Sequence, residues 1–307
     1  MSTDNAMSSI NITDPLLPHL LDILADPVSD GLILAGGFGL RLKQEYLRQT
    51  EARTLLDQFP PARATQDLDF FLRMEIWLDS EKGEAVRGLL DTLRYRARVP
   101  HLKFEKPLSP DAPDERTVKV DLLARTPRAD ENIPVRRASD PTRHPSRVGS
   151  GTGIDLHGGE TPEAFAVEDF PTLLQVSGAT TNGTPIDALV RVPHPYAWLN
   201  MKVKAADDWA ARPKPFSVKH AFDVYLLTAM LTEEEIEQAT ALAARYSDNP
   251  VATEIHDAAA RLYDKPTSPG FVEAQRQAGS PLDHEIFWEA LQVALGIPST
   301  GSRNEAQ

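Results

Sequence analysis

The chain contains no cysteine, and this absence excludes three kinds of chemistry. Without thiols there is no disulfide framework, no thiolate-ligated zinc site and no cysteine nucleophile. The sequence also has no apolar run near the roughly 20 residues needed to cross a bilayer. Its N-terminal stretch carries acidic residues and lacks the apolar core of a signal peptide. We therefore expect a cytoplasmic protein with no membrane segment.

Basic residues are scarce relative to acidic ones. The 307 residues include 32 Lys and Arg against 45 Asp and Glu, which gives a formal net charge of −13. A surface this acidic repels phosphates, so broad non-specific binding to nucleic acid is disfavoured, although a local basic patch remains compatible with RNA. The hydrophobic fraction of 41 % and the charged fraction of 25 % are ordinary for globular proteins, and they exclude a mainly disordered or fibrous chain.

The pattern of apolar residues changes character near residue 195. Short strand-like runs alternate with helical patterns before this point, and helical patterns dominate after it. The expected fold class is α+β, with a mixed sheet and flanking helices followed by a C-terminal helical domain. The expected segments are a disordered tail over 1–13, an α/β domain over 14–195, a helical domain over 196–298 and a second disordered tail over 299–307.

Local signals predict the individual elements. Strands are expected over 31–35, 66–72, 102–106, 117–124, 173–176 and 188–192, with a hairpin loop over 107–116 and a long loop over 125–163. Helix starts are expected from N-cap and proline signals. These starts are Asp14-Pro15, Ser80, the capping box at Thr232, Asn249-Pro250 and Ser280-Pro281.

Three aspartates on predicted strands are the strongest candidates for chemistry. Asp67 and Asp69 lie two residues apart on one strand, so they share a face, with backbone anchors about 7 Å apart. Asp121 lies on another predicted strand. If the two strands are neighbours, the three carboxylates meet at one place.

Such a cluster needs a counter-charge. Two like charges at about 4 Å repel by roughly 4 kcal/mol at an effective dielectric constant of 20. The cluster therefore takes up a proton or holds a cation. Oxygen ligands without His or Cys favour Mg²⁺ or Mn²⁺, and two such ions can bind carboxylates and a triphosphate together. The alternative is that these acids are solvated strand ends, which is the commoner setting of an isolated Asp-x-Asp pair.

A glycine pair follows the first predicted strand and opens a helix. Gly36 and Gly37 would leave free backbone N–H groups at a helix N-terminus, and these suit an anionic phosphate. Their small size would let the phosphate approach closely. The alternative is a tight strand-to-helix turn that needs glycine only for its dihedral angles.

Taken in order, these segments resemble the signature of the AbiEii/AbiGii-type nucleotidyltransferases, which are toxins of abortive-infection and toxin–antitoxin systems within the DNA polymerase β-like superfamily. The resemblance covers roughly residues 30–230. Its segments are Leu34-Ala35-Gly36-Gly37, Leu40-Arg41-Leu42, Arg63-Ala64-Thr65-Gln66-Asp67-Leu68-Asp69-Phe70-Phe71, Val120-Asp121-Leu122, Tyr196-Ala197-Trp198-Leu199-Asn200-Met201-Lys202 and Lys219-His220-Ala221-Phe222-Asp223-Val224-Tyr225-Leu226-Leu227. Two features depart from the family pattern: an inserted segment around 48–62, and Lys219-His220 where Arg-Asp is usual.

The resemblance implies an enzyme that transfers a nucleoside monophosphate from a nucleoside triphosphate to an acceptor hydroxyl, with Mg²⁺ or Mn²⁺ as cofactor. It also implies tRNA as a candidate acceptor and a cognate antitoxin as partner. Asp67, Asp69 and Asp121 would hold the metal ions, and Asp121 would also accept the proton of the attacking hydroxyl. Gly36 and Gly37 would bind the β- and γ-phosphates.

The helical half would supply further charged groups. Lys202 would neutralise triphosphate charge, with Lys204 as a competing candidate, and Lys219 would act in the same way from the next helix. Asp223 would tie one of these lysines in place, contact the substrate, or form a structural ion pair between helices.

Segments with arginine leave alternatives open. Arg63 and Thr65 would either orient the strand that begins at Asp67 or meet a phosphate. The stretch 125–147 is either a patch for an RNA backbone or a solvated loop. Its arginines are Arg125, Arg128, Arg136, Arg137, Arg143 and Arg147.

Two other readings of the site stay open. Within the enzyme class, the acceptor could be a protein side chain or a small molecule instead of tRNA. In a different class, the protein is a nucleotide-binding or partner-binding module without turnover.

Overall fold

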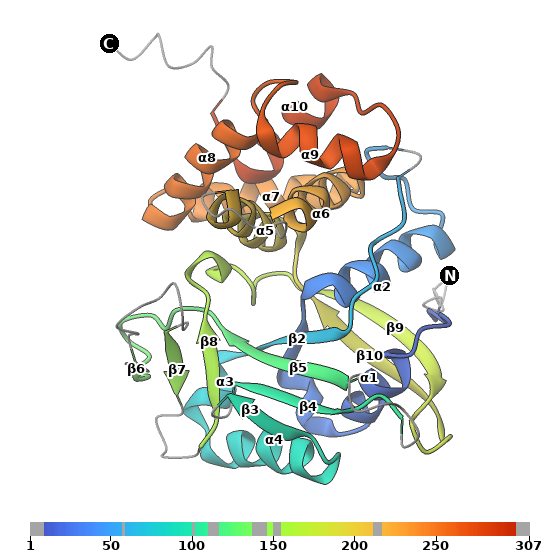
Figure 1. Cartoon of the computed structure of the whole chain (residues 1–307). Coiled ribbons are helices and arrows are strands. Elements are labelled where there is room, and N and C mark those ends of the chain that lie inside the picture. The colour runs from blue at the N-terminus through green and yellow to red at the C-terminus, as the bar shows by residue number, and fades with distance from the viewer. Residues whose placement is uncertain are drawn as a thin grey trace, which may run out of the picture. The chain divides into compact units, whose positions relative to one another are not determined.

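The structure is a computed structural model, and it describes residues 9–56, 59–99, 102–109, 117–136, 146–149, 155–210 and 217–298. The chain divides into two compact units, which we call the sheet unit and the helical unit (Figure 1). The sheet unit comprises Met1–Glu51, Arg63–Thr161 and Pro171–Pro193, and the helical unit comprises Ala52–Ala62, Pro162–Phe170 and His194–Gln307. The last boundary between the two units falls between Pro193 and His194, and the segments 52–62 and 162–170, which lie within the expected α/β domain over 14–195, belong to the helical unit.

The sheet unit contains one mixed sheet (Figure 1). Its strands are β1 (Leu32–Leu34), β2 (Asp67–Leu72), β3 (Arg96–Val99), β4 (Lys103–Pro107), β5 (Thr117–Ala124), β6 (Val135–Arg136), β7 (Arg147–Gly149), β8 (His157–Glu160), β9 (Thr172–Ala179) and β10 (Pro185–Val192). Their order is β6-β7-β8-β5-β2-β1-β10-β9, with β4 paired to β5 and β3 paired to β4. The pairs β2–β5, β5–β8 and β1–β10 are parallel and the other pairs are antiparallel.

The two faces of this sheet differ in chemistry. On β5, Val118, Val120 and Leu122 are buried, and the residues between them point to the opposite face, which also carries Asp69 of β2. We call the first the buried face and the second the carboxylate face. The helices of the sheet unit are α1 (Leu17–Leu24), η1 (Pro27–Gly31), α2 (Gly36–Gln49), α3 (Met74–Leu78) and α4 (Ser80–Thr92).

Helices α1 and α4 cover the buried face. A side chain at Gly178 of β9 would collide with Leu21 of α1, which lies 2.9 Å from the position of the missing Cβ. The guanidinium of Arg87 in α4 lies over the ring of Phe104 in β4. Helix α2 instead begins beside Asp69, on the carboxylate face, and contacts β2, β9 and β10.

The helical unit is built from α5 (Pro195–Ala210), α6 (Ser217–Ala229), α7 (Glu233–Arg245), α8 (Pro250–Tyr263), α9 (Pro269–Ala278), α10 (His284–Leu295) and the short η2 (Pro162–Ala164). The expected α+β class, with a mixed sheet, flanking helices and a helical C-terminal part, is confirmed. None of the helices in the described ranges has the length and apolarity that a bilayer span requires.

The inserted segment around 48–62 has a structural explanation. The backbone N–H groups of Leu55 and Leu56 donate to the carbonyls of Leu231 and Ala229, and Thr54 forms a β-bridge with Thr232. Residues 52–62 are therefore part of the helical unit, although they precede most of the sheet in sequence.

Several local predictions are confirmed and several need correction. The capping box of Thr232 and the Asn249-Pro250 start are present, whereas α10 begins at His284 with Asp283 as its cap, and not at Ser280-Pro281. Helix α1 begins at Leu17, because the carboxylate of Asp14 accepts from the N–H of Leu16 before the helix and also pairs with Arg41. Helix α4 is capped by Asp79 and not by Ser80.

Two loop assignments also change. The stretch 125–163, expected as a long loop, contains β6, β7, β8 and η2, and the expected strands omitted β3.

Ile10 is fully buried and forms a parallel bridge with Val176 of β9, so the ordered chain begins before Asp14 and the tail expected over 1–13 is wrong at its end. Residues 1–8 and the expected tail over 299–307 lie outside the described residues.

The capping box of α7 provides a test of local stability. Thr232 Oγ1 accepts from the N–H of Glu235 at 3.3 Å, and Glu235 Oε2 accepts from the N–H of Thr232 at 3.1 Å. Thr232→Ala removes one of these bonds, and we expect a loss of about 1 kcal/mol in the free energy of unfolding, measured in urea by circular dichroism. Thr240→Ala, at an exposed site within the same helix, is the control and should not destabilise, because alanine has the higher helix propensity. Equal losses in the two variants would contradict the capping role.

Candidate active site

Strands β2 and β5 place the predicted carboxylates side by side. The two strands are parallel neighbours, in a register that sets Asp69 opposite Asp121 and Asp67 opposite Lys119. Neighbouring strands lie about 4.8 Å apart, so the backbones of Asp69 and Asp121 are in direct contact. The meeting of the carboxylates was conditional on these two strands being neighbours, and this condition is met.

The turn from β1 into α2 lies against the carboxylate of Asp69, and we call this turn, with Gly36 at the start of the helix, the glycine corner. Gly36 has a φ of 64°, and a Cβ at this position would lie 1.8 Å from Asp69 Oδ2. The N–H of Ala35 donates to the carbonyl of Asp69 at 2.8 Å. Glycine is therefore required at position 36 for two reasons: its left-handed backbone, and the carboxylate that occupies the space of a side chain.

The N-terminus of α2 opens at this corner. Its N-cap residue, Ala35, has no side-chain cap, and the first turn contains no acidic residue. Arg63 and Thr65 pack beside Gly37, with Arg63 Nη1 at 3.6 Å from the position of its missing Cβ. Thr65 Oγ1 also accepts from the N–H of Asp67 at 3.3 Å, which is the orienting contact that was one of its two expected roles.

A lysine that the sequence analysis missed lies next to Asp121. Lys103 of β4 stands opposite Asp121 in the β4–β5 pair, and its Nζ donates to Asp121 Oδ2 at 2.5 Å. Burial acts to lower the pKa of Lys103, but the hydrogen bond to Asp121 and the charges of Asp121, Asp69 and Asp67 outweigh it, so the pKa is raised. The sequence predicted that these two strands pair, but a loop over 107–116 would set 103 opposite 120. The observed register, with Pro107 opposite Thr117, sets Lys103 opposite Asp121 instead.

The carboxylate of Asp67 is held less closely than that of Asp121. Its Oδ1 is a buried atom with no hydrogen bond from the described part of the chain, and Lys119 Nζ lies 3.8 Å away. This orphaned oxygen beside Asp69 is a place where a cation would be stabilised.

The residues at this corner fit a single Mg²⁺ or Mn²⁺ shared with a nucleotide. Magnesium is commonly held by one or two carboxylates together with substrate phosphates, and Asp67 and Asp69 can supply the carboxylates. The described residues contain no group of three or more His, Asp or Glu side chains arranged to hold a metal ion, and Asp121 accepts from Lys103. The three-carboxylate set expected from the sequence is therefore adjacent in the backbone but not gathered as a metal cage.

Lys202 and Asp223 form a buried ion pair within the helical unit. Lys202 Nζ of α5 donates to Asp223 Oδ2 of α6 at 2.7 Å, and the two side chains are 9 % and 0 % exposed. Of the alternatives for Asp223, a tie to Lys202 between two helices is the contact that the structure contains. Lys219 is exposed on α6, and Lys204 pairs with Asp208 at 2.9 Å on the surface of α5.

The described arginines of the stretch 125–147 have different surroundings. Arg125 is 4 % exposed and pairs with Glu131 through both of its terminal nitrogens, so it is unavailable to an RNA backbone. Arg136 and Arg147 stand directly opposite each other on β6 and β7. Arg128 is exposed, and Arg137 and Arg143 lie outside the described residues.

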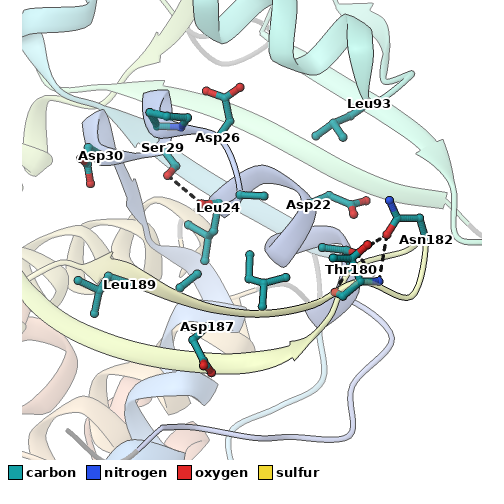
Figure 2. A pocket seen from close by; sticks show the side chains of 15 residues that line it. Asp22, Leu24, Asp26, Ser29, Asp30, Leu93, Thr180, Asn182, Asp187 and Leu189 are labelled. Carbon is teal, nitrogen blue, oxygen red and sulfur yellow. Dashed lines mark hydrogen bonds between the residues drawn. The ribbon is translucent and has the colours of Figure 1, made fainter. Parts of the chain in front are cut away.

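A separate cavity of about 680 Å³ lies between η1 and the β9–β10 hairpin (Figure 2). Its lining includes four aspartates, three of which have partners. Asp22 accepts from Lys106 and Thr181, and the carboxylates of Asp26 and Asp30 accept from the N–H of Val28 and from Arg191. Local hydrogen bonds and ion pairs therefore explain three of the four aspartates in this lining.

No protein-family model matches the chain, and no curated protein matches it. Among solved structures, the solution structure of the antibiotic-resistance factor ANT(2'')-Ia matches with a TM-score of 0.36 and 15 % identity, over 80 % of this chain and 98 % of that chain. A likeness at this level is too weak to carry an argument about function. The resemblance to the AbiEii/AbiGii toxins thus rests on the motif residues alone.

The glycine corner can be tested by stability. Gly36→Ala places a Cβ on Asp69 Oδ2, whereas Gly183→Ala, also at positive φ, meets no atom within 4 Å. Both variants bear the cost of a left-handed alanine, so we expect Gly36→Ala to lose about 1–3 kcal/mol more in the free energy of unfolding in urea. Equal losses would mean that Asp69 does not occupy this space.

The buried pair of the helical unit provides a second test. Lys202→Met leaves Asp223 buried without its cation and should cost about 3–5 kcal/mol of unfolding free energy, and the double variant Lys202→Met/Asp223→Leu should cost less. Lys204→Met breaks a surface pair and is the control, with an expected change within about 0.5 kcal/mol. Additive losses in the double variant would contradict a direct Lys202–Asp223 interaction.

Proposed function

We propose that the carboxylate face is the active site of a nucleotidyltransferase, which transfers a nucleoside monophosphate from a nucleoside triphosphate to an acceptor hydroxyl with Mg²⁺ or Mn²⁺. The observation that carries the proposal is the position of Asp69, which lies on the Gly36 corner at the start of α2 and directly opposite Asp121. This arrangement combines a helix N-terminus for phosphates with carboxylates for a cation and a proton.

The start of α2 would bind the phosphates. The backbone N–H groups of Gly36 and Gly37 lie in the first turn of a 14-residue helix that has no side-chain cap. A helix N-terminus carries a partial positive charge and unsatisfied donors, and both favour an anion. The side chains of Arg63 and Thr65 border the same turn.

Asp67 and Asp69 would hold the divalent ion together with phosphate oxygens. When bound, the ion supplies a positive charge that stabilises the departing pyrophosphate. The protein itself positions the two residues. The carboxylate of Asp69 lies against Gly36, and the backbone N–H of Asp67 donates to Thr65 Oγ1 at the start of β2.

Asp121 is the proposed acceptor of the hydroxyl proton. As the O–H bond breaks, the acceptor oxygen forms a bond to the α-phosphorus. The bond between the α-phosphorus and the bridging oxygen of pyrophosphate then breaks, and pyrophosphate leaves with that electron pair. The side chain of Asp121 is 20 % exposed, so a substrate hydroxyl can reach it.

The family resemblance assigns the neutralisation of triphosphate charge to Lys202 and Lys219. Within the helical unit, Asp223 holds Lys202 in one position, and this supports a role for Asp223 in fixing a cation.

The resemblance further suggests a toxin that modifies tRNA and is restrained by a cognate antitoxin. The opposed Arg136 and Arg147 supply local positive charge that an RNA backbone would find on an otherwise acidic protein. A protein or small-molecule acceptor, or binding without turnover, are the alternative outcomes of the experiment that follows.

Labelled transfer tests the proposed function. The protein is incubated with each of the four labelled nucleoside triphosphates and Mg²⁺, in separate reactions with total tRNA, cell protein or a panel of hydroxyl-bearing small molecules. We expect labelled tRNA, and Asp69→Asn should lower the rate on the order of 10³-fold or more.

Asp187→Asn serves as the matched control for this experiment, because Asp187 is an exposed aspartate on β10 of the same unit, in the lining of the acidic cavity. Its rate should equal that of the wild type. A label on protein or on a small molecule would identify that molecule as the acceptor in place of tRNA. Nucleotide binding without any labelled acceptor would replace the enzyme with a binding module.

A further inference from the structure

Asp121 already has a positively charged neighbour supplied by the protein. Lys103 Nζ donates to Asp121 Oδ2 at 2.5 Å. Lys103 stands opposite Asp121 on one side, and Asp69 stands opposite it on the other. The three side chains therefore form one row on the carboxylate face, in the order Asp69, Asp121, Lys103.

The position of Lys103 in this row leaves no room for a second metal ion at Asp121. Such an ion was expected from the family resemblance. A divalent ion bound to Asp121 would sit about 2 Å from a carboxylate oxygen. The ammonium of Lys103 already occupies the space beside Oδ2, and two cations at such short separation repel each other. The described residues also bring no further His, Asp or Glu to Asp121 to form a group that could hold a metal ion.

We propose that Lys103 is a built-in counter-cation that holds the Asp121 carboxylate in place of a second divalent ion, so that the site takes one divalent ion, at Asp67 and Asp69. The inference rests on the proposed function and makes it more specific. Lys103 is thereby a positioning residue: it keeps one oxygen of Asp121 engaged and leaves the other to accept the proton of the acceptor hydroxyl.

Lys119 provides the contrast within the same site. Its Nζ lies 3.8 Å from Asp67 Oδ1, which is an ion-pair distance without a hydrogen bond. The two lysine side chains are equally accessible, with 52 % of Lys103 and 51 % of Lys119 exposed. Lys119→Met therefore removes the same charge from the same sheet face without releasing Asp121.

Counting bound Mn²⁺ tests the proposal without any measurement of activity. The full chain is titrated with MnCl₂ in the presence of the α,β-methylene analogue of ATP, and free Mn²⁺ is measured by electron paramagnetic resonance against a reference titration of the analogue alone. We expect one ion per chain for the wild type, two for Lys103→Met, one for Lys119→Met and one for the charge-conserving Lys103→Arg.

The other outcomes separate the two proposals. Two ions in the wild type, or one in Lys103→Met, would overturn the role of Lys103 and leave the proposed function intact. No bound ion in the wild type, with Asp69→Asn indistinguishable from it, would contradict the proposed function itself. Lys103→Gln keeps the polarity of the side chain without its charge, and it gives the same count if Lys103→Met fails to fold.

Discussion

The close contact between Asp69 and Gly36 is the constraint on which the carboxylate face depends. The carboxylate of Asp69 occupies the space that a side chain at residue 36 would need, and the Asp69 carbonyl accepts from Ala35. These two contacts join the middle of β2 to the first turn of α2, so the strand and the helix N-terminus cannot shift independently. A carboxylate beside a helix N-terminus is also stabilised by the helix dipole, which offsets part of its repulsion from Asp121.

The parts of this site that lie within one strand or one hairpin could be predicted from the sequence. Strands were predicted over 117–124 and 102–106, where β5 and β4 lie, and the hairpin loop between them predicted their antiparallel pairing. The same hairpin did not predict the Lys103–Asp121 pair, because a loop over 107–116 sets 103 opposite 120 and a one-residue difference in register moves a side chain to the other face. Strands β6, β7 and β8 were not predicted, because they are two to four residues long and their stability comes from pairing with distant segments.

Local capping signals predicted a helix start correctly only where no other capping residue lay nearby in the sequence. The capping box of Thr232 is local and complete, and it was predicted correctly. Ser280-Pro281 has equal merit as a helix start, but Asp283 caps the helix three residues later. The placement of residues 52–62 could not be predicted, because it depends on backbone hydrogen bonds from Leu55 and Leu56 to residues more than 170 positions away. The segment that departs from the family pattern is therefore a structural part of the helical unit.

The charged pairs of the two units are better explained by positioning than by stability. Half-exposed pairs such as Lys103–Asp121 contribute little to folding, because solvent screens them and two side chains lose freedom. The fully buried Lys202–Asp223 pair carries a desolvation cost that its attraction only partly offsets, and well-packed apolar residues would serve stability at least as well. What both pairs provide is a fixed charge: in each pair the lysine holds one oxygen of the carboxylate and thereby helps to set its orientation. The nucleotidyl transfer proposed for the carboxylate face needs such fixed geometry more than it needs additional binding strength, because the proposed chemistry depends on charges that are already in place when the substrate arrives.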